Sequence, residues 1–384
     1  MPVYADPTDG LAVPVQLLRT WTAGLLGTIG TPPDIAADVA EILVASDRRG
    51  IASHGTARLP NYVALVEAGV LDPAARPVQD AGRTALVRFD GRNGWGHHAS
   101  RVAVDWAIEA VARTGAATAV VRNSNHYGIA GWYALRAAER GLIGISLSNT
   151  SPLVAPTRAR KAMLGTNPIA IAAPAGRFGS FCLDMATSPV PRGRIEGAAR
   201  RGEALPVGWA IDADGRPALT PESALAGALH PLGGEEATAG YKGYGLALAV
   251  DMLTGVLGGA AFGPNIIGLF STEAPSDLGQ AFIVIDPAAI DEAGAFERRL
   301  EGYLDQLVAA PLAPGAPGRV IIPGEPEAEA AARSDERGVV IDAVHAAGLR
   351  ALGERLGFPF PDPITAAPAP APGSGPGQAV DRGG

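Results

Sequence analysis

The stretch from residue 117 to residue 148 constrains the fold of this chain more than any other. It reads as a buried strand over Ala117–Arg122, a polar loop over Asn123–Gly128, a helix over Ile129–Arg140 and a second strand over Leu142–Ser148. A strand, a helix and a strand of these lengths predict two parallel strands joined by a right-handed crossover. The chain is therefore expected to adopt an α/β fold.

The rest of the pattern is helical at first and mixed afterwards. Further helices are predicted over Val13–Gly30, Pro33–Arg48, Leu59–Ala68, His98–Arg113, Arg192–Arg201, Leu246–Leu257 and Phe296–Val308. Further strands are predicted over Thr84–Asp90, Pro168–Ala173, Phe181–Met185 and Ala281–Asp286. From Phe358 onward the chain turns to Pro, Ala and Gly, a composition typical of a disordered tail.

Charge and cysteine content exclude several classes of protein. The net charge of the 384 residues is -8 and no long basic run occurs, so we expect neither nucleic-acid binding nor membrane-surface binding. No apolar run reaches the length of a membrane span, and the first residues lack the pattern of a signal peptide. Cys182 is the only cysteine and no zinc-binding spacing occurs, so we expect a cytoplasmic protein without a metal site.

The segment Asp47–Arg58 gathers side chains suited to a small acidic substrate. It contains Ser53, His54 and three arginines within twelve residues. Histidine transfers a proton near neutral pH, and arginine holds a carboxylate through two parallel hydrogen bonds. An idle polar turn between two helices fits the local composition equally well.

A second polar loop, Asn123–Gly128, follows the first strand of the crossover and contains His126, and Thr150 follows the second strand. Ligands gather at the carboxyl ends of strands in open α/β sheets, so both places are candidates for a site. One loop histidine is more often a surface or capping residue, but two such loops favour function. A structural role at the start of a helix explains His97 and His98 better than a catalytic one. No motif near His230 or His345 indicates a function.

No Gly-x-Gly-x-x-Gly motif follows a predicted strand, which argues against a Rossmann dehydrogenase. The glycine-rich turn Gly240–Gly245 is the remaining phosphate candidate, because Lys242 precedes a predicted helix whose N-terminus favours anions. An ordinary turn is the alternative.

Several short motifs follow one another in a specific order. They are Ser53-His54-Gly55, Arg58-Leu59-Pro60, Asn123-Ser124-Asn125-His126-Tyr127-Gly128, Leu164-Gly165-Thr166-Asn167-Pro168, Leu183-Asp184-Met185-Ala186-Thr187-Ser188, Tyr241-Lys242-Gly243-Tyr244-Gly245 and Pro323-Gly324-Glu325. Together they resemble the malate/L-lactate dehydrogenase family of the sulfolactate dehydrogenase type. This family includes ureidoglycolate dehydrogenase, diketogulonate reductase and piperideine-2-carboxylate reductases.

The resemblance implies a non-Rossmann α/β fold with a helical N-terminal region and a mixed central sheet, binding NAD or NADP, usually as a homodimer. It implies a helical substrate region over residues 1–115, a cofactor-binding α/β region over 116–310, a C-terminal return to the first region over 311–357, and the tail over 358–384. The implied cofactor contacts are Thr150, Ser180, Phe181, Cys182, Leu183, Asp184, Met185, Ala186, Tyr241, Lys242, Pro323, Gly324 and Glu325.

On this basis we expect hydride transfer between NAD(P)H and C2 of a small 2-hydroxy or 2-oxo acid such as malate, lactate or sulfolactate. His54 matches the family's proton carrier, and His126 matches the histidine with that role in some members. Asp184 is expected either to hold a histidine or to contact the cofactor. The expected substrate contacts are Arg48, Ser53, Arg58 and Thr166.

Alternative functions are a cyclic-imine reductase, a catalytically silent nucleotide-binding protein and, without a ligand cluster to support it, a metal-dependent lyase. The loop 157–161 departs from the family, because Arg158, Arg160 and Lys161 stand where many members have glycines. We expect this loop to influence which substrate is accepted. The sequence does not decide between NAD and NADP.

Overall fold

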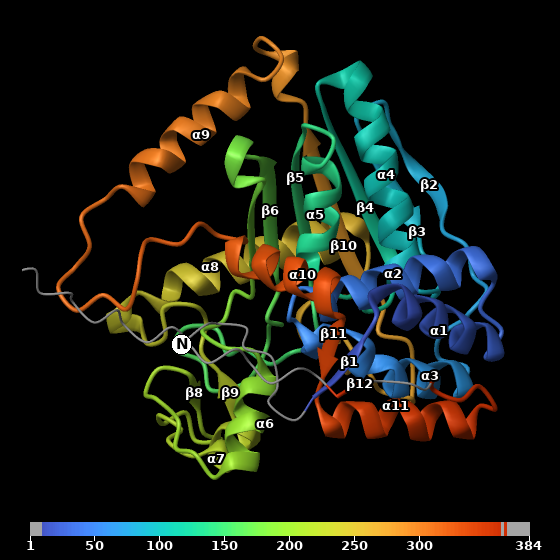
Figure 1. Cartoon of the computed structure of the whole chain (residues 1–384). Helices are drawn as coiled ribbons and strands as arrows, with labels where there is room; N and C mark the ends of the chain where they lie inside the picture. Colours follow the sequence, from blue (N-terminus) through green and yellow to red (C-terminus); the bar gives the residue numbers. More distant parts are fainter. Residues whose placement is uncertain (1–9, 362–364, 367–384) are drawn as a thin grey trace, which may run out of the picture.

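The computed structural model describes residues 10–361 and 365–366, and its centre is a seven-stranded sheet (Figure 1). The strands, in their spatial order, are β2 (Val78–Arg83), β3 (Leu86–Asp90), β4 (Ala116–Ser124), β10 (Leu278–Ile285), β5 (Ile143–Ser148), β6 (Ile169–Pro174) and β7 (Ser180–Met185). Only the pair β3–β4 is parallel within this sheet, and the other neighbours are antiparallel. The prediction of a mixed central sheet is confirmed.

The predicted crossover has the expected direction but not the expected neighbours. Strand β10 pairs antiparallel with both β4 and β5, so β4 and β5 run parallel to each other. They are nevertheless separated, because β10 lies between them. A strand from the distant residues 278–285 therefore completes the centre of the sheet, which the local pattern could not indicate.

Helices cover both faces of the sheet. On one face, α4 (Gly96–Thr114) packs on β4 and β10, and α5 (Ala130–Ala138) packs on β5 and β6. Tyr133 and Phe282 are fully buried in the core between these layers. On the other face, α8 (Gly240–Asp251) and its π-helical continuation η5 (Met252–Val256) contribute Val250 and Leu253, which pack against Val120 and Leu147.

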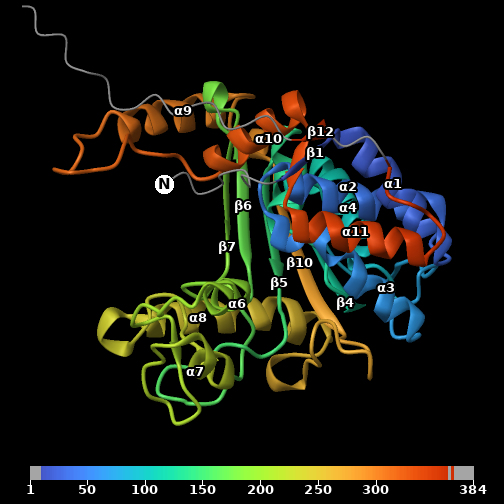
Figure 2. The same cartoon turned by 60° about the horizontal axis from the view of Figure 1, so that its bottom comes forward.

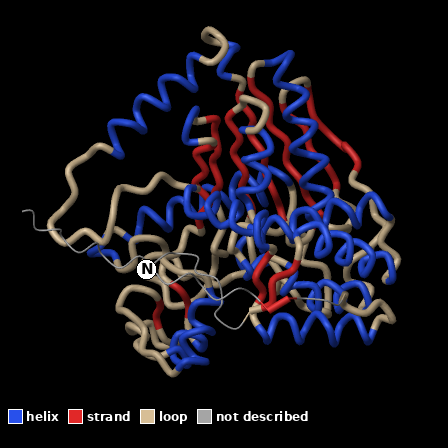
Figure 3. Tube along the Cα trace, in the orientation of Figure 1, coloured by secondary structure: helices blue, strands red, loops and turns tan. Residues whose placement is uncertain are grey.

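A second, mainly helical core lies beside the sheet (Figures 1 and 3). Its helices are α1 (Val15–Thr28), α2 (Pro33–Arg48), α3 (Leu59–Glu67) and α11 (Ala343–Arg355), and α10 (Glu325–Arg337) contacts α2. Helix α2 begins at a proline, whose fixed φ suits the first turn, and Asp34 lies in that turn. A small sheet of β11 (Val339–Ile341), β1 (Leu11–Val13) and β12 (Thr365–Ala366) joins the two ends of the described chain.

A small lobe projects from the sheet, in yellow-green at the lower left of Figure 1 and at the bottom of Figure 2. It contains α6 (Arg192–Arg201), β8 (Ala210–Ile211), α7 (Pro221–Ala226) and β9 (Ala228–Leu229) around its own apolar cluster. Helix α9 (Ala295–Val308) extends away from the other helices (Figure 1). No helix of the described residues is long and apolar enough to cross a membrane.

Several elements differ from the sequence-based expectations. Strand β2 lies where none was predicted, and β2 and β3 belong to the central sheet although they precede residue 116. Helix α8 already begins at Gly240, where we predicted a turn. The expected tail also begins later, because Phe360 packs edge-on against Trp21 with ring centroids 4.6 Å apart. Residues 362–364 and 367–384 of that tail lie outside the described residues.

Candidate active site

The segment between α2 and α3 is compact. It forms two single helical turns, η1 (Ala52–His54) and η2 (Thr56–Arg58), which lead directly into α3. Both turns contact α2, and η2 also contacts α11. The segment is therefore supported from the helical core on two sides.

His54 and His126, predicted from separate loops, come together. Their ring centroids are 5.5 Å apart. Tyr62, from α3, is buried beside them, and its Oη lies 2.6 Å from His126 Nδ1 and 3.5 Å from His97 Nε2. The His97 ring lies 6.3 Å from that of His126, so a third histidine packs against Tyr62 behind the other two.

Ser53 and Arg58 complete this group. Ser53 Oγ lies 2.8 Å from His54 Nδ1, and Arg58 Nε donates to the Ser53 carbonyl oxygen at 2.6 Å. Phe270 packs against both Arg58 and His126. The Arg58 guanidinium lies 5.4 Å and the His126 ring 5.7 Å from its ring centroid. We call Ser53, His54, Arg58, Tyr62, His126 and Phe270 the histidine site.

Electrostatics favours the neutral form of these histidines. Desolvation, followed by the nearby Arg58 charge, lowers the pKa of His54 to about 4. Desolvation also lowers the pKa of His126 well below its usual value, and the neighbouring histidines and Arg58 act in the same direction. Near neutral pH both rings are therefore uncharged, as a proton acceptor requires.

Two members of the histidine site were not anticipated. Tyr62 follows the Arg-Leu-Pro motif by two residues, and no sequence signal linked it to His126. Phe270 lies in an irregular segment between η5 and β10, where neither spacing nor composition marks a function. His97, expected to be structural because it follows Trp95, is fully buried behind Tyr62.

Two expected contacts take other partners. Arg48, predicted to hold a substrate carboxylate, forms an ion pair with Asp335 of α10, with Nε donating to Oδ1 at 2.6 Å. One of the two predictions for Asp184 was a hydrogen bond that orients a histidine. Instead its Oδ2 accepts a hydrogen bond from Gly131 N–H at the start of α5, at 2.7 Å. Desolvation raises the pKa of the Asp184 carboxyl to about 6, although the side chain reaches solvent.

Two of the expected cofactor segments meet at the edge of the sheet. Cys182 N–H, on edge strand β7, donates to the Pro323 carbonyl oxygen at 3.0 Å. Gly324 adopts a φ of 92°, and a Cβ there would lie 2.8 Å from Cys182 Cβ. Glycine is therefore required where the chain crosses β7 and enters α10, and Glu325 begins that helix.

Thr150 and Thr166 also lie together, at the carboxyl end of β5. Thr166 N–H donates to Thr150 Oγ1 at 3.0 Å, and Thr150 N–H donates to Asn167 Oδ1 at 3.1 Å. The expected cofactor contact Thr150 and the expected substrate contact Thr166 therefore belong to one hydrogen-bonded group, which Asn167 holds in place.

Lys242 lies within the first turn of α8 rather than in a flexible turn. It is exposed, as is its neighbour Tyr241. Gly243 packs against the backbone of Leu232, whose N–H donates to Thr187 O two residues after β7. The N-terminus of α8 is thus connected to the chain that leaves β7, and an exposed cation lies at a helix N-terminus there.

The cationic loop 157–161 contacts the segment that leads into α8. Arg158 forms an ion pair with Glu236, which precedes α8. Of the arginines on α6, Arg192 pairs with Glu196 and Arg201 with Glu203. No group of three or more His, Cys, Asp or Glu side chains in the described residues is arranged to hold a metal ion.

Comparisons with known proteins give the family and the fold. The family model described as malate/L-lactate dehydrogenase matches residues 13–350. Malate dehydrogenase of Pyrococcus abyssi is 41% identical over 308 residues, which cover 79% of this chain and 83% of that protein. L-sulfolactate dehydrogenase of Methanocaldococcus jannaschii is 36% identical over 305 residues, covering 79% and 85%. The solved malate dehydrogenase of Pyrococcus horikoshii superposes with a TM-score of 0.85 at 34% identity, covering 93% and 98%.

The names of further relatives mention cofactors and other substrates. They include (2R)-3-sulfolactate dehydrogenase (NADP(+)) of Chromohalobacter salexigens (35% identical, covering 76% and 83%) and ureidoglycolate dehydrogenase (NAD(+)) of Escherichia coli (33%, covering 77% and 82%). A pyrroline/piperideine-2-carboxylate reductase of Pseudomonas syringae is 34% identical, covering 88% and 95%. The matches over most of the chain confirm the predicted fold and its oxidoreductase class, and this chain belongs to the malate/L-lactate dehydrogenase family.

Proposed function

We propose that this enzyme transfers a hydride reversibly between NAD(P)H and C2 of a small 2-hydroxy or 2-oxo acid. One observation carries the proposal: two histidine rings, both with lowered pKa values, lie 5.5 Å apart beside the Arg58 guanidinium. A proton carrier and a carboxylate partner are what the interconversion of a 2-hydroxy acid and a 2-oxo acid requires. The names of the relatives, which are malate and sulfolactate dehydrogenases, support the same substrate class.

His54 is the proposed proton carrier. Ser53 occupies its Nδ1, so the substrate oxygen exchanges a proton with Nε2. In oxidation the neutral ring accepts the hydroxyl proton, and in reduction the protonated ring returns it to the developing alkoxide. His126 acts beside it: in the tautomer whose Nδ1 accepts from the Tyr62 hydroxyl, Nε2–H donates to the same oxygen.

Arg58 is the proposed carboxylate partner. The Arg58 Nε–H bond to the Ser53 carbonyl fixes the guanidinium plane, and its Nη groups present two parallel donors to a carboxylate. Phe270 packs against that plane and shields it from water, which strengthens a charged hydrogen bond. Thr166 is retained as a proposed substrate contact at the nearby end of β5.

The residues around β7 fit a nicotinamide nucleotide, whose C4 supplies or accepts the hydride when it is bound. Lys242 and the N-terminus of α8 suit its phosphates. The Gly324 crossing lets backbone approach β7 closely, and Thr150 offers a hydroxyl. The remaining proposed contacts are Ser180, Phe181, Cys182, Leu183, Asp184, Met185, Ala186, Tyr241, Pro323 and Glu325.

We also propose that the enzyme is a cytoplasmic homodimer. Apolar side chains on one helix support the dimer, because Leu246, Leu248, Met252 and Val256 of α8 and η5 are exposed to solvent. Tyr241 and Lys242 begin the same helix, so a second copy bound there would lie next to the proposed nucleotide contacts. The single cysteine is compatible with a reducing compartment.

A substrate panel tests the function. The purified protein is offered 2-oxo acids, their 2-hydroxy counterparts and cyclic imino acids with both NAD(H) and NADP(H), and the absorbance of the reduced cofactor is followed. Turnover of 2-oxo acids supports the proposal. Turnover of cyclic imines alone identifies the reductase alternative, binding of NAD(P)H without turnover identifies a silent nucleotide-binding protein, and activity that disappears with chelator identifies a metal-dependent enzyme.

A further inference from the structure

A buried carboxylate lies beneath the loop that carries His54 and Arg58. Asp47, near the end of α2, is 6% exposed. Its Oδ2 accepts two hydrogen bonds from Thr56, one from the backbone N–H at 2.9 Å and one from Oγ1–H at 2.6 Å. Its Oδ1 has no hydrogen-bond partner among the described residues. The two bonds to Thr56 are therefore what this carboxylate contributes to the structure.

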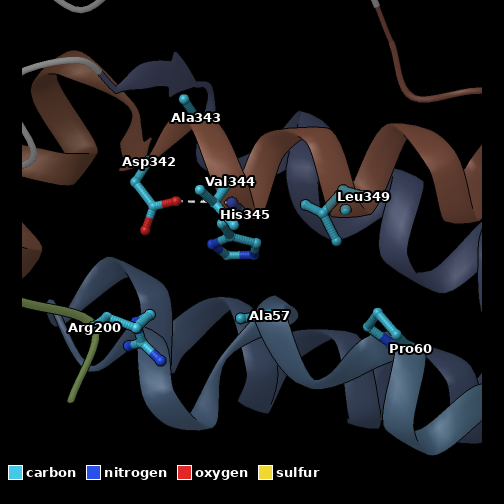
Figure 4. A pocket seen from close by; sticks show the side chains of 9 residues that line it. Ala57, Pro60, Arg200, Asp342, Ala343, Val344, His345 and Leu349 are labelled. Carbon is cyan, nitrogen blue, oxygen red and sulfur yellow. Dashed lines mark hydrogen bonds between the residues drawn. The ribbon is translucent and has the colours of Figure 1, made fainter. Parts of the chain in front are cut away.

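Thr56 is supported from its other side by His345. The threonine hydroxyl has one proton, which it donates to Asp47, so its oxygen accepts the bond from His345 Nε2 at 3.0 Å. His345 is fixed in the first turn of α11, where its backbone N–H donates to the capping Asp342 Oδ1 at 2.7 Å. Figure 4 shows the His345 ring pointing from α11 toward the turn that carries Ala57, along the wall of a pocket.

Gly55 shows how closely Asp47 fits under the loop. A Cβ at position 55 would lie 1.8 Å from Asp47 Oδ1. The φ of Gly55 is -93°, which any residue adopts, so glycine is needed here for space rather than for backbone freedom. The carboxylate therefore contacts both Gly55 and Thr56, the two residues that connect His54 to the turn of Arg58.

We propose that Asp47 is a positioning residue: through Thr56, braced by His345, it fixes the backbone that sets His54 and Arg58 at their working separation. This inference rests on the proposed function of those two side chains. Desolvation raises the pKa of Asp47 to about 7, but Oδ2 accepts from Thr56 whether or not Oδ1 carries a proton. A neutral amide at this position accordingly keeps the acceptor, whereas an alanine removes it.

Two matched pairs of variants test the proposal in the full-length protein. Asp47→Ala removes both bonds and Thr56→Val removes the hydroxyl bond, whereas Asp47→Asn and Thr56→Ser keep both. Displacements on the order of 1 Å cost roughly 100-fold in rate, so we expect the first two to lower kcat/KM for the 2-oxo acid by about 10- to 100-fold. Their KM for NAD(P)H should stay unchanged, and the second two should retain most of the activity.

Hydrogen exchange of the peptide covering residues 50–60 provides a readout that does not need turnover. Loss of the acceptor in Asp47→Ala, or of the hydroxyl donor in Thr56→Val, should accelerate exchange of this peptide, while the peptides of β4 and β10 stay protected. If Asp47→Ala does not fold, Thr56→Val decides alone, because it keeps the carboxylate and nearly the same side-chain volume.

The outcomes are distinct from those of the proposed function. If the wild-type protein turned over no 2-oxo acid, the proposed function would be wrong. The hydrogen-exchange data would still show whether Asp47 holds the loop. Equal kcat/KM in the bond-removing and bond-keeping variants, with His54→Ala inactive, would overturn the present inference alone. Unchanged exchange of the 50–60 peptide in Thr56→Val would overturn it as well.

Discussion

The histidine site and the proposed nucleotide contacts differ in how completely this single chain encloses them. Tyr62 is 1% exposed and holds His126 from behind, while Asp47 and His345 brace the loop of His54. By contrast, Tyr241 is 52% exposed, Lys242 is exposed, and β7 is the last strand of its sheet. The difference teaches that the proposed proton-transfer geometry is preorganised, whereas the proposed nucleotide side presents an open edge and a helix end.

Replacing His54 tests the preorganised side most severely. General acid–base catalysis contributes roughly 100- to 10,000-fold, so His54→Ala should lower kcat by about that factor. Binding of NAD(P)H, measured by fluorescence titration, should not change. His230→Ala, in the small lobe, is the matched control and should keep its activity. Wild-type turnover in His54→Ala would show that His54 is not the proton carrier.

Arg58→Lys asks whether the guanidinium is a two-point carboxylate partner. Loss of a charge-assisted hydrogen bond costs about 1.5–3 kcal/mol, so KM for the 2-oxo acid should rise about 10- to 100-fold. Arg48→Lys is the control, because Arg48 already pairs with Asp335. Steady-state kinetics would contradict the assignment if the two variants raised KM equally.

Lys242→Ala probes the open side. One exposed phosphate contact is worth about 1 kcal/mol, so the Kd of NAD(P)H should rise about 5- to 10-fold while KM for the 2-oxo acid stays constant. Lys161→Ala removes another exposed cation, in the loop beyond Arg158, and should leave the Kd unchanged. If Lys242→Ala raised only the KM for the 2-oxo acid, Lys242 would belong to the substrate site and not to the nucleotide contacts.

The Gly324 crossing can be tested by stability. An alanine there must adopt a φ of 92° and place its Cβ 2.8 Å from Cys182 Cβ, which should cost about 1–3 kcal/mol. Gly318→Ala is the control, because a Cβ at position 318 meets nothing within 4 Å. Denaturant unfolding measures both free energies, and equal values would show that the crossing tolerates a side chain.

The smallest expected effect is a change in pH dependence. His54 must be neutral to accept a proton, and its pKa is lowered to about 4, so kcat/KM for oxidation should stay level from about pH 5.5 to 8 and fall only in more acidic solution. Arg58→Gln removes a nearby positive charge, which should raise the pKa and move the acid limb toward neutral pH. An acid limb that does not move would show that Arg58 does not act on His54.

Local sequence patterns identified elements and motifs well because both depend on neighbouring residues. Helices α2 and α6 occupy the predicted residues, and His54 and His126 were singled out by their loops. The failures are contacts between distant segments. Gly243 was read as part of a turn, but it lies inside α8, and its missing side chain lets the helix approach the backbone of Leu232.

The same reason explains which parts of the site were missed. Phe270 and Tyr62 are separated by more than two hundred residues, and only the fold brings their ring centroids to 5.7 Å. Arg48 carried the same signal as Arg58, but α10, which was not predicted, supplies Asp335 as its partner. Side-chain type therefore indicated which residues suit the chemistry, and tertiary contacts decided which of them are available for it.

The late arrival of β10 in the centre of the sheet has a consequence for how the enzyme is made. On the ribosome, β4 and β5 emerge more than a hundred residues before Gln280, which pairs with Ser148, and Ala281, which pairs with Val120. Until then both strands have an unpaired edge, and such edges promote aggregation of nascent chains. The enzyme should therefore fold slowly and late in synthesis, and its production in a foreign host should depend on chaperones that protect the unfinished sheet.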